Sequence, residues 1–192
     1  MPLIFIFWSV VAAYVIHVLD ESLLGGSFVE KVRAHWWPEY SWRKFFWFNT
    51  GYFLIMIASV VAYDFLGGSW VVLPLAWTLE RAANGFWHLW WTIRFREYSP
   101  GLVTSILMWM SPYFLFRYAL PTAGITASEW LTSIAIAAVA TIFLFVTFPL
   151  IHAYRKAKEA DPTSCTRSPT APRHVAQQSK TDYETGMSVI RG

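Results

Sequence analysis

Three polar residues within the apolar stretch 70–93 have types and a spacing that suit chemistry. Glu80, Asn84 and His88 are four residues apart, so they share one face of a helix. An acid, an amide and an imidazole in hydrocarbon are costly unless they face the protein interior. The spacing therefore predicts a buried polar site that needs partners from another part of the chain.

The expected partners are His17, Asp20 and Glu21, near the end of another apolar stretch. Together the two groups offer two imidazoles and two or three carboxylates, a set that suits Fe(II), Mn(II) or Zn(II). The same set is sufficient for acid/base catalysis without a metal, because buried carboxylates can hold protons that an imidazole relays. The predicted metal ligands are His17, Glu21, His88 and Glu80, and the predicted catalytic residues are Glu80, Asp20, Asn84 and Tyr98.

The composition indicates that a membrane holds these residues in place. The 192-residue chain is 56% hydrophobic and 14% charged, whereas a soluble domain is about 25% charged. Apolar runs long enough to cross a bilayer predict an all-α, polytopic transmembrane bundle of about five spans, with the lipid bilayer as its main partner. The predicted spans are residues 2–24, 45–65, 70–93, 102–120 and 129–154.

The remaining segments complete the predicted domain organisation. The first run lacks a basic start and a cleavage site, so we interpret it as a retained helix that ends at Gly25-Gly26. Residues 27–44 mix basic residues with Trp and are typical of an interfacial segment. The transmembrane domain is residues 1–156, and the polar residues 157–192 are predicted to form a disordered cytoplasmic tail.

Basic residues are distributed unequally between the two ends of these runs. If the spans alternate in direction, one side carries Lys31, Arg33, Arg43, Lys44, Arg94, Arg96, Arg155, Lys156 and Lys158. The other side carries little beyond Arg117. Because Lys and Arg mark cytoplasmic loops, we predict an outside N-terminus and a cytoplasmic C-terminus, in the plasma or inner membrane.

This topology places the polar residues of different helices in one depth zone. At 1.5 Å per residue, His17, Glu21 and His88 lie within about 10 Å of the cytoplasmic boundary. Asn84 lies about 14 Å and Glu80 about 20 Å from the same boundary. Asn49, Thr104 and His152 fall within about two turns of the boundary. Ionisable groups that share a level favour a functional site over separate packing roles.

Simpler roles are open for some of these residues. Asp20 is also placed to cap the first helix and face solvent, and Asn49 to hydrogen-bond between helices. Arg81 is an alternative partner of Glu80 or Glu21 in a structural ion pair. His152 precedes Tyr154-Arg155-Lys156, which favours an interfacial anchor.

Three functions agree with this pattern. The first is a membrane enzyme, metal-dependent, that oxidises, desaturates or hydrolyses a lipidic or isoprenoid-like substrate. The second is a metal-free acid/base isomerase or cyclase, with aromatic faces stabilising a cation. The third is a small transporter or ion-binding membrane module. None of the three involves nucleic acid, and the oligomeric state does not follow from the sequence.

Part of the chain resembles a family of small integral membrane proteins named after its HXXEE motif. The resemblance lies in His17-x-x-Asp20-Glu21, then Asn84-x-x-x-His88, then Tyr98-x-Pro100-Gly101-x-x-Thr104, and covers about residues 10–120. Asp20 stands where the family motif has its first Glu, which keeps the charge but shortens the side chain. The position is therefore either a ligand or a group that supports one. The resemblance implies which positions matter and does not imply a reaction.

Overall fold

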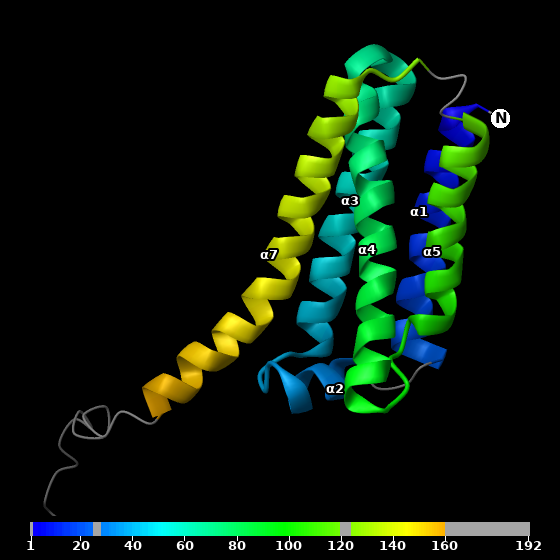
Figure 1. The fold of residues 1–192 in the computed structure, drawn as a ribbon. Coiled ribbons are helices and arrows are strands. Elements are labelled where there is room, and N and C mark those ends of the chain that lie inside the picture. Colours follow the sequence, from blue (N-terminus) through cyan, green and yellow to red (C-terminus); the bar gives the residue numbers. More distant parts are fainter. Residues whose placement is uncertain (1, 25–27, 120–123, 160–192) are drawn as a thin grey trace, which may run out of the picture. The chain divides into compact units, whose positions relative to one another are not determined.

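Helix α1 (Leu3–Leu19) is the central element of the computed structural model, which describes residues 2–24, 28–119 and 124–159. It packs against α3 (Trp42–Leu66), α4 (Val72–Phe95) and α5 (Leu102–Phe114) (Figure 1). Ile6, Phe7 and Val10 of α1 are buried in the main core, together with Met56 of α3 and Leu75 of α4. The described residues are all-helical or turn, as the apolar runs predict.

Two of the long helices continue into π-helical turns. Helix α1 passes into η1 (Asp20–Leu24), and α5 passes into η3 (Leu115–Ala119). Pro112 lies near the end of α5, where it lacks the N–H that an α-helix requires. The change in helical geometry follows this proline by three residues. Gly25-Gly26, the predicted end of the first helix, lies outside the described residues.

The short helix α2 (Phe28–His35) packs beneath the bundle by its apolar side (Figure 1). Val29 and Val32 of α2 are buried against Phe45 of α3 and Trp91 of α4. Helix α3 then begins after Ser41, whose hydroxyl accepts a hydrogen bond from the Lys44 amide, a normal N-cap contact. The segment predicted to be interfacial thus contains a packed amphipathic helix.

The five predicted spans correspond to helices, but these differ in their ability to cross a membrane. Leu3–Leu23, Trp42–Leu66 and Ala127–Val146 are long and apolar enough, which is consistent with membrane association. Helix α4 follows a 3₁₀ turn, η2 (Gly68–Val71), and it contains Glu80, Arg81 and Arg94, which lower its apolarity. Helix α5 has only 13 residues before η3 begins.

Helix α7 (Ala127–Glu159) begins with a capping box. The Glu129 amide donates to the Thr126 hydroxyl, and the Glu129 carboxylate accepts from the Thr126 amide. Residues 1–153 form one compact unit, and residues 154–192 form a second. The helix extends through Glu159, past the predicted domain boundary at residue 156, and the rest of the predicted tail lies outside the described residues.

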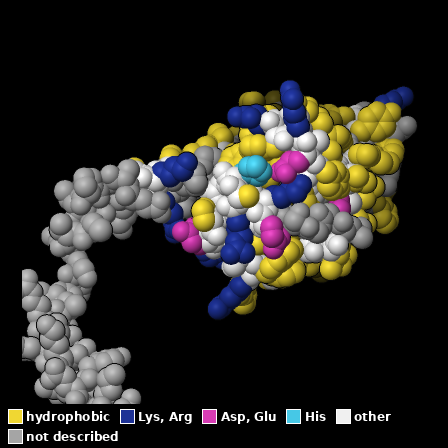
Figure 2. Space-filling view, turned by 90° about the horizontal axis from the view of Figure 1, so that it is seen from below, with side chains coloured by type: hydrophobic (Ala, Val, Ile, Leu, Met, Phe, Trp, Pro, Cys, Tyr) yellow, Lys and Arg dark blue, Asp and Glu magenta, His cyan; other side chains and the backbone are white. Residues whose placement is uncertain are grey.

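Lys and Arg side chains gather on the end of the first unit that carries α2 (Figure 2). Several acidic side chains and a histidine lie among them on this face. The end contains α2, the start of α3 and the turn between α4 and α5 (Figure 1). The basic loops that the sequence places together therefore meet at one end of the bundle.

Candidate functional site

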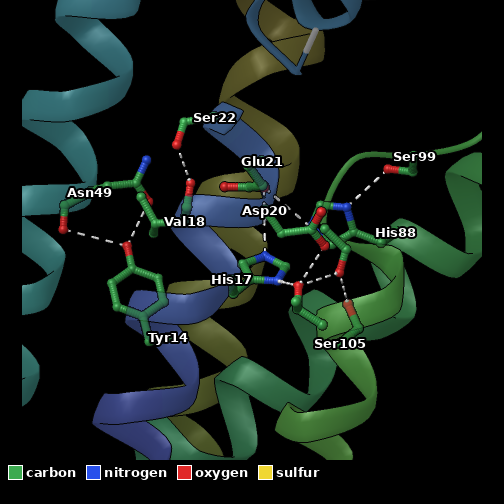
Figure 3. Close-up of polar contacts among 12 residues, drawn as sticks. Tyr14, His17, Val18, Asp20, Glu21, Ser22, Asn49, His88, Ser99 and Ser105 are labelled. Carbon is green, nitrogen blue, oxygen red and sulfur yellow. Dashed lines mark hydrogen bonds and ion pairs between the residues drawn. The ribbon is translucent and has the colours of Figure 1, made fainter. Parts of the chain in front are cut away.

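The side chains of His17, Glu21 and His88 converge at the end of the bundle that α2 covers (Figure 3). One carboxylate oxygen of Glu21 lies 3.6 Å from His17 Nε2 and 3.4 Å from His88 Nε2. The exposed fractions are 1% for His17, 5% for Glu21 and 0% for His88. The two imidazoles meet edge to face, with 4.8 Å between ring centroids. Three potential metal ligands from α1, η1 and α4 thus form one buried cluster.

The cluster lies where α1 becomes π-helical. The Asp20 amide ends α1 by bonding to the carbonyls of both Ile16 and His17, and Glu21 is the second residue of η1. A π-helical turn is wider than an α-helical one and is frequent at functional sites. The turn sets the direction of the Glu21 side chain relative to His17.

A hydroxyl group fixes the tautomer of His17. Thr104 Oγ1 lies 3.0 Å from His17 Nδ1, 2.9 Å from an Asp20 carboxylate oxygen and 3.1 Å from the Gly101 carbonyl. The carboxylate and the carbonyl only accept hydrogen bonds, so the Thr104 hydroxyl donates to one of them and accepts from Nδ1–H. Nε2 of His17 therefore carries a lone pair that faces Glu21 and His88.

His88 is held in a similar way. Its Nδ1 lies 2.9 Å from the hydroxyl of Ser99, whose exposed fraction is 0%. The Ser99 amide donates to the Thr92 hydroxyl at 3.1 Å, and this contact fixes the loop that carries Ser99. Each imidazole thus has Nδ1 occupied by a hydroxyl, which leaves Nε2 directed into the cluster.

Gly101 lets the loop between α4 and α5 approach both imidazoles. An added Cβ would lie 2.7 Å from His17 Cε1, 2.9 Å from His88 Cε1 and 3.2 Å from Glu21 Cγ. The φ angle of Gly101 is +96°, a region that residues with a side chain rarely adopt. Only glycine fits this position without displacing the cluster.

The geometry of the three side chains is close to that needed to hold one divalent ion. Ligand atoms about 2.1 Å from a common ion lie roughly 3.0–3.4 Å apart when adjacent. The two contacts of Glu21 are close to this range, and all three ligand atoms lie within 4.8 Å of one another. Both Nε2 atoms are buried and have no hydrogen-bond partner within the described part of the chain. Metal-bound imidazoles have the same arrangement, in which the other ring nitrogen is held by a polar group.

A cavity of about 90 Å³ adjoins the cluster. Helices α1, α2, α3, α4 and α7 contribute to its walls, and its lining includes His17, Glu21 and His88. Aromatic side chains form most of the remaining wall, from Phe28, Trp36, Tyr40, Phe48, Tyr52, Trp87, Trp91 and Phe145. An apolar wall with a few polar groups at one place is typical of small-molecule sites.

Glu80 lies apart from the three-residue cluster. Its carboxylate accepts from Arg81 Nε at 2.6 Å and from Arg81 Nη2 at 2.7 Å, and it also accepts from the Tyr52 hydroxyl. Glu80 is 1% exposed and Arg81 5% exposed, so this is a buried ion pair. The structural partnership with Arg81, which the sequence left open, is formed, whereas a role for Glu80 as a metal ligand stays a prediction.

The other predicted residues have distinct surroundings. Asp20 contacts the cluster through Thr104 and is 4% exposed, so it is not a solvent-facing cap. Asn84 lines the cavity. The Tyr98 side chain is 41% exposed, while its backbone carbonyl accepts a hydrogen bond from Lys31. Asn49 lines the cavity and accepts a hydrogen bond from the Tyr14 hydroxyl at 2.6 Å. The side chain of His152 is not among those described.

Sequence reasoning missed three contributors. Ser99 could have been noticed as the hydroxyl beside Pro100-Gly101, close to the predicted site in sequence. Tyr52 and Trp36 have no comparable signal, because α3 and the end of α2 reach the cavity only through tertiary packing.

Polar contacts of Glu97 hold α2 against this end of the bundle, and we call this set of contacts the polar latch. Glu97, in the loop after α4, accepts from Trp91 Nε1 at 2.8 Å, contacts His35 at 3.1 Å and lies 3.7 Å from Lys31 Nζ. The Trp91 hydrogen bond, followed by the charge of Lys31 and the contact with His35, lowers the pKa of Glu97 below its ordinary value. The latch therefore favours an ionised Glu97.

We expect acid to remove the stabilisation that this latch provides. A lowered pKa in the folded state stabilises the protein fully above the ordinary pKa of 4.5, and the effect is lost as pH falls through the lowered pKa. The melting temperature of the wild type should exceed that of Glu97→Gln at pH 6, and the difference should vanish in acid. Melting in detergent from pH 3 to pH 7 checks this. A difference independent of pH would show that the charge of Glu97 is unimportant.

The fold and the site define a class: within its described residues, an all-helical protein with three helices long and apolar enough to span a membrane and a buried histidine–carboxylate cluster at one end of the bundle. The chain belongs to the family described as protein of unknown function with HXXEE motif, whose model matches residues 8–117, more than half of the chain. The match contains all three cluster residues and Gly101, and α7 lies beyond it. No curated protein and no solved structure matches the chain.

Proposed function

We propose that the protein is a metal-dependent membrane enzyme that acts on a hydrophobic substrate bound in the aromatic cavity. His17, Glu21 and His88 would hold Fe(II), Mn(II) or Zn(II). The observation that carries the proposal is the convergence of two buried, unpartnered Nε2 atoms on one carboxylate. Neutral imidazoles and a carboxylate in this combination suit these metals.

Two histidines and one carboxylate leave further positions open on a bound ion. With iron, this ligand set is typical of oxygen-dependent oxidation, and with zinc it is typical of hydrolysis. When bound, the metal would supply that chemistry. Thr104 would keep His17 in the ligating tautomer, Ser99 would hold Nδ1 of His88, and Asp20 would orient Thr104. The aromatic walls would bind the substrate's apolar part and limit water.

The metal-dependent enzyme is favoured over the two alternatives. An acid/base isomerase centred on Glu80 is less well supported, because both carboxylate oxygens are occupied by hydrogen bonds from Arg81 and Tyr52. For a carrier, polar groups would be expected along a path to the opposite end. At that opposite end, the core around Ile6, Phe7 and Leu75 is apolar, which does not favour a carrier.

We also propose five membrane spans, with the N-terminus outside and the C-terminus in the cytoplasm of a plasma or inner membrane. The helices at all five predicted positions and the basic end in Figure 2 support this topology. Glu80, Arg81 and His88 of α4 can be accommodated in a span because they are buried in the protein, and Arg94 lies in the last turn of the helix. The cluster would then open toward the cytoplasmic side.

Metal analysis of the purified protein tests the proposal. We expect about one equivalent of Fe, Mn or Zn in wild type, and none in a His17→Ala/His88→Ala variant that melts as a folded protein. His35→Ala is the matched control, because this histidine lies outside the cluster and should leave the metal content unchanged. Plasma mass spectrometry after reconstitution with each metal provides the measurement. Equal metal in wild type and the double variant, or none in either, would refute the metal-dependent enzyme.

A further inference from the structure

Four residues that line the cavity each have a buried polar side-chain atom with no hydrogen-bond partner within the described residues. Two are the Nε2 atoms of His17 and His88, which belong to the proposed ligand cluster. The others are Asn84 Oδ1, an acceptor, and Trp36 Nε1, a donor. A polar atom removed from water without a partner is costly, so these two atoms point to a ligand that satisfies them.

Asn49, the other asparagine that lines the cavity, has hydrogen-bond partners for both polar atoms of its side chain. Asn49 Oδ1 accepts from the Tyr14 hydroxyl at 2.6 Å, and Asn49 Nδ2 donates to the Phe45 carbonyl at 2.9 Å. Asn84 Oδ1 has no such contact, although it lines the same cavity. Hydrogen bonds within the protein therefore account for the polar side chain of Asn49 in this cavity. They do not account for Asn84 Oδ1.

The position of Asn84 relates it to the cluster. Asn84 precedes His88 by four residues on α4, so the two side chains lie on one face, about one turn or 6 Å apart. A ligand group bound to Asn84 is thus held one turn from the Nε2 atoms. The rest of that ligand meets aromatic rings, including those of Phe48, Trp87 and Phe145.

We propose that the cavity selects a hydrophobic alcohol, a molecule with one hydroxyl on an apolar body. In this proposal, the alcohol hydroxyl donates a hydrogen bond to Asn84 Oδ1. The N–H of Trp36, a residue that lines the same cavity, donates a hydrogen bond to the alcohol oxygen. A hydroxyl is the smallest group that both donates and accepts. The inference deepens the proposed function by naming the substrate class, and it rests on that function only in treating the bound alcohol as a substrate.

The test uses 12-bromododecan-1-ol and 1-bromododecane, which share a chain and a tryptophan quencher and differ by the hydroxyl. Bromine quenches on contact, and Trp36, Trp87 and Trp91 line the cavity. We expect wild type in detergent to be quenched at about tenfold lower mole fraction by the alcohol, since a site built for a hydroxyl discriminates against its absence. Asn84→Leu should abolish this preference, and Trp36→Phe should reduce it.

Asn49→Leu is the matched control. It should keep the alcohol preference but melt at lower temperature, because Tyr14 and Phe45 lose a partner. Asn84→Leu should melt no lower than wild type. Equal quenching of wild type by the two probes, or a preference that survives Asn84→Leu, would overturn the inference.

Metal content of the same samples separates the two proposals. If wild type prefers the alcohol but binds no metal after reconstitution, the cavity inference is supported and the metal-dependent enzyme is refuted. If wild type binds metal but shows no alcohol preference, the cavity inference is overturned and the metal site is supported.

Discussion

Replacing Glu80 with leucine should destabilise the folded protein by about 3–5 kcal/mol, because it leaves the Arg81 guanidinium buried without a counter-ion. Arg81 is only 5% exposed. Arg81 also lies over the ring faces of Tyr52 at 4.2 Å and Tyr14 at 5.0 Å, which compensate a charge only in part. Unfolding in mixed micelles with increasing sodium dodecyl sulfate measures the loss.

The double variant Glu80→Leu/Arg81→Met is the decisive control. If the uncompensated charge causes the loss, removing both partners should restore most of the stability, since a buried ion pair is often replaceable by apolar side chains. Tyr52→Phe removes one hydrogen bond and should cost about 1 kcal/mol. Loss of equal size in the single and double variants would mean that the ion pair itself, and not the orphaned arginine, stabilises the fold.

Replacing Gly101 with alanine should cost about 2–5 kcal/mol in unfolding free energy and abolish metal binding. The added methyl group would lie 2.7 Å and 2.9 Å from the Cε1 atoms of His17 and His88, so at least one ring must move. Moving either ring separates the atoms that would bind one ion under the proposed function. Melting temperature and metal content of the same preparation check both effects.

Two other glycines separate collision from backbone strain. Gly67 has a φ of +61° and nothing within 4 Å of an added Cβ, so Gly67→Ala adds strain without a collision. Gly51, within α3, has open space and an ordinary φ, so Gly51→Ala should be neutral or slightly stabilising. If Gly101→Ala resembled Gly67→Ala and kept its metal, close packing of the loop on the cluster would be refuted.

Sequence periodicity was sufficient to predict the helices and the cluster residues. The apolar runs matched helices within a few residues, and His17, Glu21 and His88 are brought together in the structure. The prediction worked because ionisable residues in apolar helices have few low-energy positions other than beside one another. Their role as metal ligands is still a prediction.

Other features depend on contacts that no spacing encodes. Glu80 shares a helical face with His88, yet its carboxylate binds Arg81, its neighbour in sequence, through that residue's long side chain. Residues at i and i+1 normally point in different directions, so spacing did not decide between Glu80 and Glu21 as the partner of Arg81. The contact of Gly101 with two imidazoles depends on how α4 and α5 dock, and the π-helical turn at Asp20 has no sequence signature that we used.

The origin of the cluster in distant helices has a consequence for biosynthesis. His17 and Glu21 lie in α1 and η1, and synthesis reaches His88 and the Ser99–Gly101 loop only after α3 has been made. A nascent chain therefore carries two of the three cluster residues before the third has been made. The α4–α5 hairpin then supplies His88 and the loop residue Gly101 that packs against both imidazoles. Under the proposed function, metal loading is consequently a late step in maturation, and a chain truncated before His88 would carry an incomplete ligand set.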